Sequence, residues 1–167
     1  MTRSCRTFAM TNLVKIGLLC LAIYASSATL GTSEKAFEIF KGLQGTWAIL
    51  SEGKTLRIQM SYEVASNGSI VTEQFGRELS VLYLDRGSVQ MIHFCNAGNQ
   101  PRLKLKDGGR PDLLTFEIFD ITNLKSTNTA HVEKIIYKII SANKLDLEIL
   151  WREGNSQRSE IYILTKI

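Results

Sequence analysis

This 167-residue chain contains only three cysteines, which leaves little scope for disulfide bonds. Two of them, Cys5 and Cys20, lie in an N-terminal segment with the pattern of an export signal. Only Cys95 would remain after that segment is removed, which excludes an internal disulfide. A conventional hydrophobic core of about 139 residues must then supply the stability. In an oxidising compartment a single thiol is either buried or reactive.

The chain also lacks a long run of basic residues outside its first 28 positions. It has 20 lysines and arginines against 16 acidic residues, but Arg3, Arg6 and Lys15 belong to the N-terminal segment, which has no acidic residue. The remaining 17 basic and 16 acidic residues nearly balance. Nucleic acid is therefore not an expected partner.

Residues 1–28 have the order of a secretory signal. A positively charged start is followed by an apolar run, Leu13 to Tyr24, and then by the small residues Ala25 to Ala28. The apolar run is shorter than a membrane span requires. We predict cleavage after Ala28 and a periplasmic or extracellular location for residues 29–167. An uncleaved N-terminal anchor remains the alternative.

One short helix is expected, over Ser33 to Leu43. Ser33 is a suitable N-cap, Glu34 lies in the first turn, and Phe37 and Phe40 fall at helical spacing. Such a helix would close one end of a barrel.

Alternating apolar and polar residues dominate the remainder. In Thr55 to Ala65 every second residue is apolar, which is typical of a strand with one wet face. Asn67-Gly68 predicts a two-residue hairpin turn. Ten strands are expected: Thr46–Leu50, Thr55–Ala65, Ser69–Phe75, Glu78–Leu84, Ser88–Cys95, Arg102–Lys106, Leu113–Asp120, His131–Ile140, Leu145–Arg152 and Arg158–Lys166.

No helix of crossover length separates these strands, which excludes parallel pairing as the general plan. We predict an all-β fold: a single antiparallel up-and-down β-barrel of about ten strands, because closure removes exposed strand edges. A two-sheet sandwich remains possible. There is no internal repeat or domain linker.

Several short motifs recur in a known group of proteins. They are Gly45-Thr46-Trp47, His93-Phe94-Cys95, Asn99-Gln100-Pro101-Arg102, Thr122-Asn123-Leu124 and His131, together with Phe116 and Asp120. In these motifs the chain resembles an exported bacterial calycin-like family, with a lipocalin-type β-barrel and no known function. The resemblance covers roughly residues 43–165. It implies a barrel, and it implies that a late basic residue, Arg158 or Lys166, covers Trp47. We assign structural roles to Gly45, Trp47, Trp151, Asn99, Gln100 and Asn123.

The candidate site is formed by polar residues that alternation places inside the barrel. His93 and Cys95 share a face with Met91, while Asp120 follows the inward set of its strand. Counting back from the inward Ile135 places His131 and Glu133 inside with Tyr137. We therefore expect a cluster at one end of the barrel, with ligand-binding residues His93, Cys95, Asp120, His131, Glu133 and Tyr137.

Three interpretations of His93, Cys95, Asp120 and His131 stay open. They could form a satisfied polar network, a zinc or haem site, or a Cys-His nucleophilic pair. The leading functional prediction is non-catalytic binding of a small, largely apolar molecule inside the barrel, without a cofactor. The alternatives are a metal- or haem-binding protein, a hydrolase-like enzyme, and a module that binds another protein through its outer face.

Overall fold

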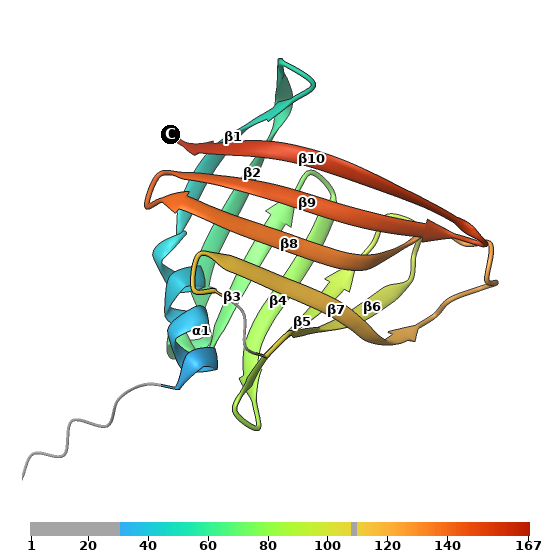
Figure 1. The fold of residues 1–167 in the computed structure, drawn as a ribbon, viewed down its shortest axis with the longest axis horizontal. Helices are drawn as coiled ribbons and strands as arrows, with labels where there is room; N and C mark the ends of the chain where they lie inside the picture. The colour runs from blue at the N-terminus through green and yellow to red at the C-terminus, as the bar shows by residue number, and fades with distance from the viewer. Residues whose placement is uncertain (1–30, 108–109) are drawn as a thin grey trace, which may run out of the picture.

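The computed structural model describes residues 31–107 and 110–167, which contain one α-helix, one short 3-10 helix and ten strands (Figure 1). The predicted export signal, residues 1–28, lies outside the described residues. In chain order the elements are α1 (Thr32–Gly42), β1 (Gly45–Ser51), β2 (Lys54–Ala65), η1 (Ser66–Gly68), β3 (Ile70–Phe75), β4 (Glu78–Asp85), β5 (Ser88–Phe94), β6 (Gln100–Leu105), β7 (Leu113–Thr122), β8 (His131–Ser141), β9 (Lys144–Glu153) and β10 (Ser156–Lys166).

The strands form one closed antiparallel barrel. Each strand pairs with its neighbours in sequence, and β1 closes the ring by pairing with both β2 and β10. Neighbouring strands run in opposite directions, as their short connections require. The predicted all-β up-and-down barrel with one N-terminal helix is confirmed for the described part of the chain, and the sandwich alternative is wrong.

Alternation along the strands decides which side chains fill the interior. In β9, Leu145, Leu147, Ile149 and Trp151 are all buried. In the β9–β10 ladder, Tyr162 lies opposite Leu147, Glu160 opposite Ile149 and Arg158 opposite Trp151. Because directly opposed residues share a face, β10 also directs polar side chains into the barrel.

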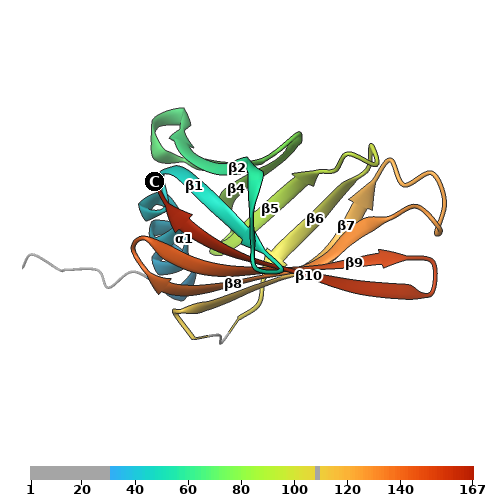
Figure 2. The same cartoon turned by 90° about the horizontal axis from the view of Figure 1, so that it is seen from above.

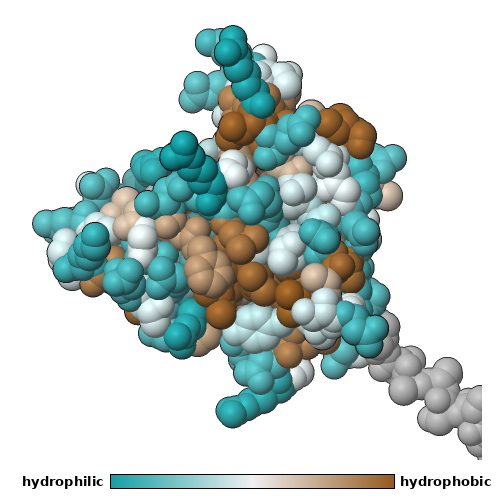
Figure 3. All heavy atoms as spheres, turned by 180° about the vertical axis from the view of Figure 1, so that it is seen from behind, coloured by the Kyte–Doolittle hydropathy of each residue, from teal (hydrophilic) through white to brown (hydrophobic). Residues whose placement is uncertain are grey.

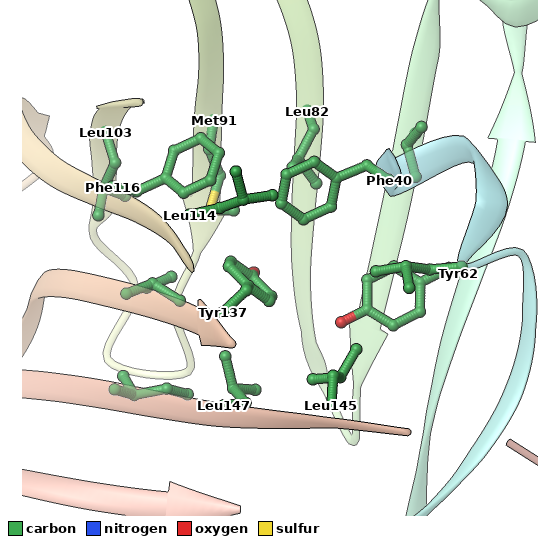
Figure 4. Close-up of a cluster of buried hydrophobic side chains, with 14 of the residues drawn as sticks. Phe40, Tyr62, Leu82, Met91, Leu103, Leu114, Phe116, Tyr137, Leu145 and Leu147 are labelled. Atoms are coloured by element: carbon green, nitrogen blue, oxygen red, sulfur yellow. The ribbon is translucent and has the colours of Figure 1, made fainter. Parts of the chain in front are cut away.

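Helix α1 closes one end of the barrel with an aromatic plug. Phe40 is fully buried. Its ring makes edge-to-face contacts with Phe116, at 5.7 Å between centroids, and with Tyr137, at 5.0 Å (Figure 4). Burying one such side chain contributes about 1.5–3 kcal/mol. This half of the interior is therefore filled with side chains.

The connection between α1 and β1 is a tight turn with a buried tryptophan beside it. Gly45 has a φ of 128°, a conformation that suits glycine. Trp47 is fully buried and donates from Nε1 to the Leu43 carbonyl oxygen at 2.8 Å. Lys166 Nζ lies 5.6 Å from its ring centroid, which is the covering role expected for a late basic residue. The other candidate, Arg158, lies over Trp151 instead.

Two local predictions need correction. The N-cap of α1 is Gly31, two residues before the predicted Ser33, because the helix begins at Thr32; Ser33 is a buried residue of the first turn. The β2–β3 connection is a four-residue link and not a two-residue turn, since the ladder ends at Ala65 and Ile70. Positive φ angles at Ser66, Asn67 and Gly68 reverse the chain there.

The barrel wall opens at the end away from α1. In the described structure, β1 pairs with β10 through Trp47–Leu50 and Ile163–Lys166, and β2 pairs with β3 from Met60 onward. Beyond those residues the β1–β2 hairpin diverges from β10 (Figure 1). Figure 2 shows the β9–β10 hairpin and the β7–β8 loop extending past the rest of the barrel at this end. We call this region, between the first half of β10 and the end of β3, the lateral opening.

The outer face of β4 and β5 is partly apolar. Leu79 lies opposite Phe94, and Val81 lies opposite Ile92, so these four side chains are contiguous on the surface. Figure 3 shows apolar surface in the middle of the face opposite to that of Figure 1. An interaction module would need such a patch, and that hypothesis stays a prediction.

Among the described residues, no helix is both long and apolar enough to cross a membrane.

Candidate functional site

Glu78, His93 and Cys95 come together inside the barrel, near the lateral opening. Ser80 of β4 lies directly opposite His93 of β5, which places Glu78 and Cys95 one step further along the same inward faces. Glu78 Oε2 lies 3.7 Å from His93 Nε2. The Cys95 thiol donates to Glu78 Oε1 at 3.6 Å. Potential metal-ligand atoms of all three residues lie within 4.8 Å of one another.

The opposite side of the His93 ring continues into a buried hydrogen-bond chain. His93 Nδ1 lies 3.0 Å from Ser80 Oγ. Ser80 donates to Glu73 Oε1 at 3.1 Å, and Tyr137 donates to Glu73 Oε2 at 2.7 Å. A serine hydroxyl has one proton, so while Ser80 donates to Glu73 its oxygen accepts from His93 Nδ1–H. In this hydrogen-bond chain the neutral His93 ring carries its proton on Nδ1 and its lone pair on Nε2.

Burial sets the protonation of this network. Desolvation raises the pKa of Glu73, although hydrogen bonds from Tyr137, Tyr62 and Ser80 oppose the shift. Desolvation lowers the pKa of His93 and outweighs the opposite effect of Glu78, which favours a neutral imidazole.

The Cys95 thiol has the opposite properties from an activated nucleophile. Burial raises its pKa, and the negative charge of Glu78 adds to that effect, while the Ala97 amide opposes it. Reactive cysteines have a lowered pKa in positively charged surroundings. The geometry therefore favours a thiol that stays protonated unless a cation is bound beside it.

A second polar group borders the lateral opening. Trp151 Nε1 donates to Glu160 Oε2 at 3.0 Å, and Tyr162 donates to the same oxygen at 2.8 Å. Arg158 forms an ion pair with Glu160 and lies 5.0 Å from the Trp151 ring centroid. The Trp151 ring also meets the His93 ring edge-on at 6.4 Å, so the two groups of residues are adjacent.

Asp120 does not join the site. The β6–β7 register shifts between Arg102 and Leu103, which pair with Asp120 and Ile118 respectively. This β-bulge inserts Phe119 and reverses the faces that follow it. Asp120 is exposed and lies 3.0 Å from Arg102 on the outer face, so its predicted inward position is wrong.

His131 and Glu133 are also displaced by a bulge. The β8–β9 register shifts between Val132 and Lys134, with Val132 opposite the inward Trp151. His131 lies opposite Arg152 on the outer face, and its Nδ1 is 2.9 Å from the Thr129 carbonyl oxygen. Glu133 pairs with Arg152 at 2.7 Å. The expected convergence of both histidines is therefore wrong, because Glu133 is the extra residue of the bulge.

Asn99, Gln100 and Asn123 connect the loops at the open end. Asn99 is fully buried and donates to the Ala130 carbonyl oxygen at 2.9 Å. Gln100 and Asn123 both donate to the Gly98 carbonyl oxygen, at 2.9 and 2.6 Å. These bonds tie the segment after Cys95 to the β7–β8 loop.

Sequence reasoning missed Glu73, Glu78 and Ser80, although alternation contains the signal. Glu73 lies between Val71 and the partly buried Phe75 at two-residue spacing, and Glu78 and Ser80 precede the buried Leu82 in the same way. Polar residues in inward positions of two consecutive strands indicate an interior network.

No protein-family model matches this chain. A search of curated proteins likewise returns no match.

Proposed function

We propose that this protein is an exported, non-catalytic binding protein that takes a small, largely apolar molecule at the lateral opening of its barrel. The sequence predicts such a guest inside the barrel, beside polar residues at one of its ends. Phe40, Phe116 and Tyr137 fill the half nearest α1, so we place the guest at the opposite end.

The observation that carries the proposal is that the aromatic side chains lining the barrel are fully buried at one end and only partly buried at the other. Near α1 the interior rings are fully buried, whereas Phe75 and Tyr162 at the lateral opening are only partly buried. Their rings meet edge-to-face at 5.1 Å. Partly accessible aromatic rings on an inward face suit an apolar guest, because the guest would bury the ring surface that still contacts water.

Polar groups beside these rings would orient the guest. Glu78 is 12% exposed at its side chain, and His93 is 6% exposed. Ligand pockets combine apolar walls with a few polar groups of this kind. A guest with one hydrogen-bonding group would place it toward Glu78, with its apolar part against Trp151 and Tyr162.

The two tryptophans provide a direct test by NMR. Trp151 Nε1–H donates to Glu160 at the lateral opening, whereas Trp47 Nε1–H donates to Leu43 at the closed end. We would titrate uniformly nitrogen-15-labelled protein with N-phenyl-1-naphthylamine, a neutral apolar probe, after assigning both indole signals with Trp47→Phe and Trp151→Phe variants. The proposal predicts a saturable shift of the Trp151 signal and an unmoved Trp47 signal.

Two results would contradict this proposal: neither indole signal moves, or the Trp47 signal moves instead. If the Trp151 signal shifts as expected, native mass spectrometry of protein purified from the exported fraction would identify the natural guest by its mass. The Tyr162→Ala variant should bind the probe with altered affinity. Tyr83→Ala, on the outer face of β4, is the matched control and should leave the affinity unchanged. Tyr83 is partly buried too, and its hydroxyl donates to Gln90 Oε1 at 3.3 Å.

A further inference from the structure

We propose that Glu78, His93 and Cys95 form a zinc-binding site with three protein ligands. This inference goes beyond guest binding and depends on different atoms, namely one carboxylate oxygen, His93 Nε2 and Cys95 Sγ. Glu78 begins β4, His93 lies in the paired strand β5, and Cys95 directly follows β5, so the barrel wall holds the three ligands in place.

The separations suit one small ion. Zinc bonds of about 2.0–2.3 Å in a tetrahedral arrangement place neighbouring ligand atoms about 3.3–3.8 Å apart. Glu78 Oε2 and His93 Nε2 are 3.7 Å apart, and the other oxygen of the same carboxylate, Oε1, lies 3.6 Å from Cys95 Sγ. When each residue offers one ligand atom, the three atoms lie within 4.8 Å of one another, so no pair needs to approach by more than about 1 Å to reach a tetrahedral edge.

His93 points an unpartnered nitrogen at this position. Its Nε2 is buried and has no hydrogen-bond partner within residues 31–107 and 110–167. The Nδ1 bond to Ser80, which continues to Glu73, keeps the lone pair on Nε2. Metal-bound histidines have the same support, with the second ring nitrogen bonded to a carboxylate or another polar group.

Charge also favours a cation here. The Nε2 lone pair faces the Glu78 carboxylate, and two acceptors in contact repel each other unless a proton or a metal ion lies between them. When Zn²⁺ binds, a Zn–S bond forms and the thiol proton of Cys95 passes to water. The two negative charges of Glu78 and thiolate then neutralise the ion, which reduces the cost of burying it.

The ligand types select the metal. A thiolate and an imidazole favour zinc over magnesium or calcium, which prefer oxygen ligands. The Ala97 backbone N–H donates to Cys95 Sγ at 3.4 Å and would support the thiolate. Three protein ligands leave the fourth tetrahedral position for water or for a guest.

Zinc titration by calorimetry tests the proposal on the full chain. Wild type is expected to bind one Zn²⁺ through these residues. The variants Glu78→Gln, His93→Gln and Cys95→Ser should each weaken zinc binding at least about tenfold. His131→Gln is the matched control, because His131 is the second buried histidine of the described residues and lies on the outer face. Equal zinc affinity in wild type and His93→Gln would overturn the proposal.

A second measurement needs no variant and stays informative if a substitution prevents folding. Zinc should slow alkylation of Cys95 by iodoacetamide, and a chelator should restore the rate, as followed on the Cys95 peptide by mass spectrometry. Cobalt in place of zinc should give a thiolate charge-transfer band that Cys95→Ser abolishes. An unchanged alkylation rate would refute the site even if the naphthylamine probe still shifts Trp151, so the two proposals fail separately.

Discussion

The aromatic plug of α1 makes a quantitative prediction about stability. Phe40 is fully buried and contacts the Phe116 and Tyr137 rings edge-to-face. Phe→Ala substitutions in a core cost about 3–5 kcal/mol, and each edge-to-face pair supplies about 0.5–1.5 kcal/mol beyond its buried area. We therefore expect Phe40→Ala to lower the free energy of unfolding by about 4 kcal/mol. At about 3 °C per kcal/mol for a domain of this size, Tm should fall by about 12 °C.

Urea denaturation followed by circular dichroism would measure this loss. Phe119→Ala is the matched control, because Phe119 is 54% exposed and its truncation should change stability by less than about 0.5 kcal/mol. The cavity left by Phe40→Ala would be apolar, so benzene should restore part of the lost Tm in that variant and not in wild type. Equal costs for the two alanine variants, or no benzene effect, would refute the plug.

Three further predictions concern single groups. Tyr137→Phe removes a donor from the buried Glu73 carboxyl and should cost about 1–3 kcal/mol in urea denaturation; a neutral result would contradict that bond. Burial raises the pKa of Glu73 in the folded protein above its ordinary value of 4.5. The free energy of unfolding of wild type should therefore fall relative to that of Glu73→Gln as pH rises above 4.5. Parallel profiles of unfolding free energy from pH 4 to 7 would disprove this. Gly45→Ala should cost more than about 1 kcal/mol, because φ is 128° and the added Cβ would meet Lys166 Cε at 2.9 Å. Gly42→Ala, with nothing within 4 Å of its added Cβ, is the control, and equal Tm values would reject the argument.

The barrel was predictable because strand alternation records burial directly. Every second residue of Leu145 to Trp151 is apolar and buried, and short turns between such runs favour antiparallel pairing. The pairing of His93 with Cys95 was predictable for the same reason, since residues two apart on a strand share a face.

The misplaced site residues, Asp120, His131 and Glu133, result from bulges. A bulge adds one residue and reverses the faces beyond it. In β8, Val132 and Ile135 are both inward although they are three residues apart, and this odd spacing is the sequence trace of the bulge. Phe119 similarly interrupts the alternation before Asp120. Which residue of such a run is extra is decided by the neighbouring strand, so one strand read alone does not specify it.

Among the described residues, Glu73, Glu78 and Glu160 are acidic residues of the inner face of the barrel, and they differ in how many hydrogen bonds they accept. This difference indicates where a ligand would add most. Glu73 accepts from Tyr137, Tyr62 and Ser80 and is enclosed by the core. Glu160 is bonded by Trp151, Tyr162 and Arg158. By contrast, Glu78 accepts one backbone amide, at 3.1 Å, and one thiol, a weak donor. A carboxylate has about four acceptor positions, so Glu78, beside the unpartnered nitrogen of His93, keeps the most unused bonding capacity of the three. A metal ion or the polar group of a guest would gain more there than at Glu73 or Glu160.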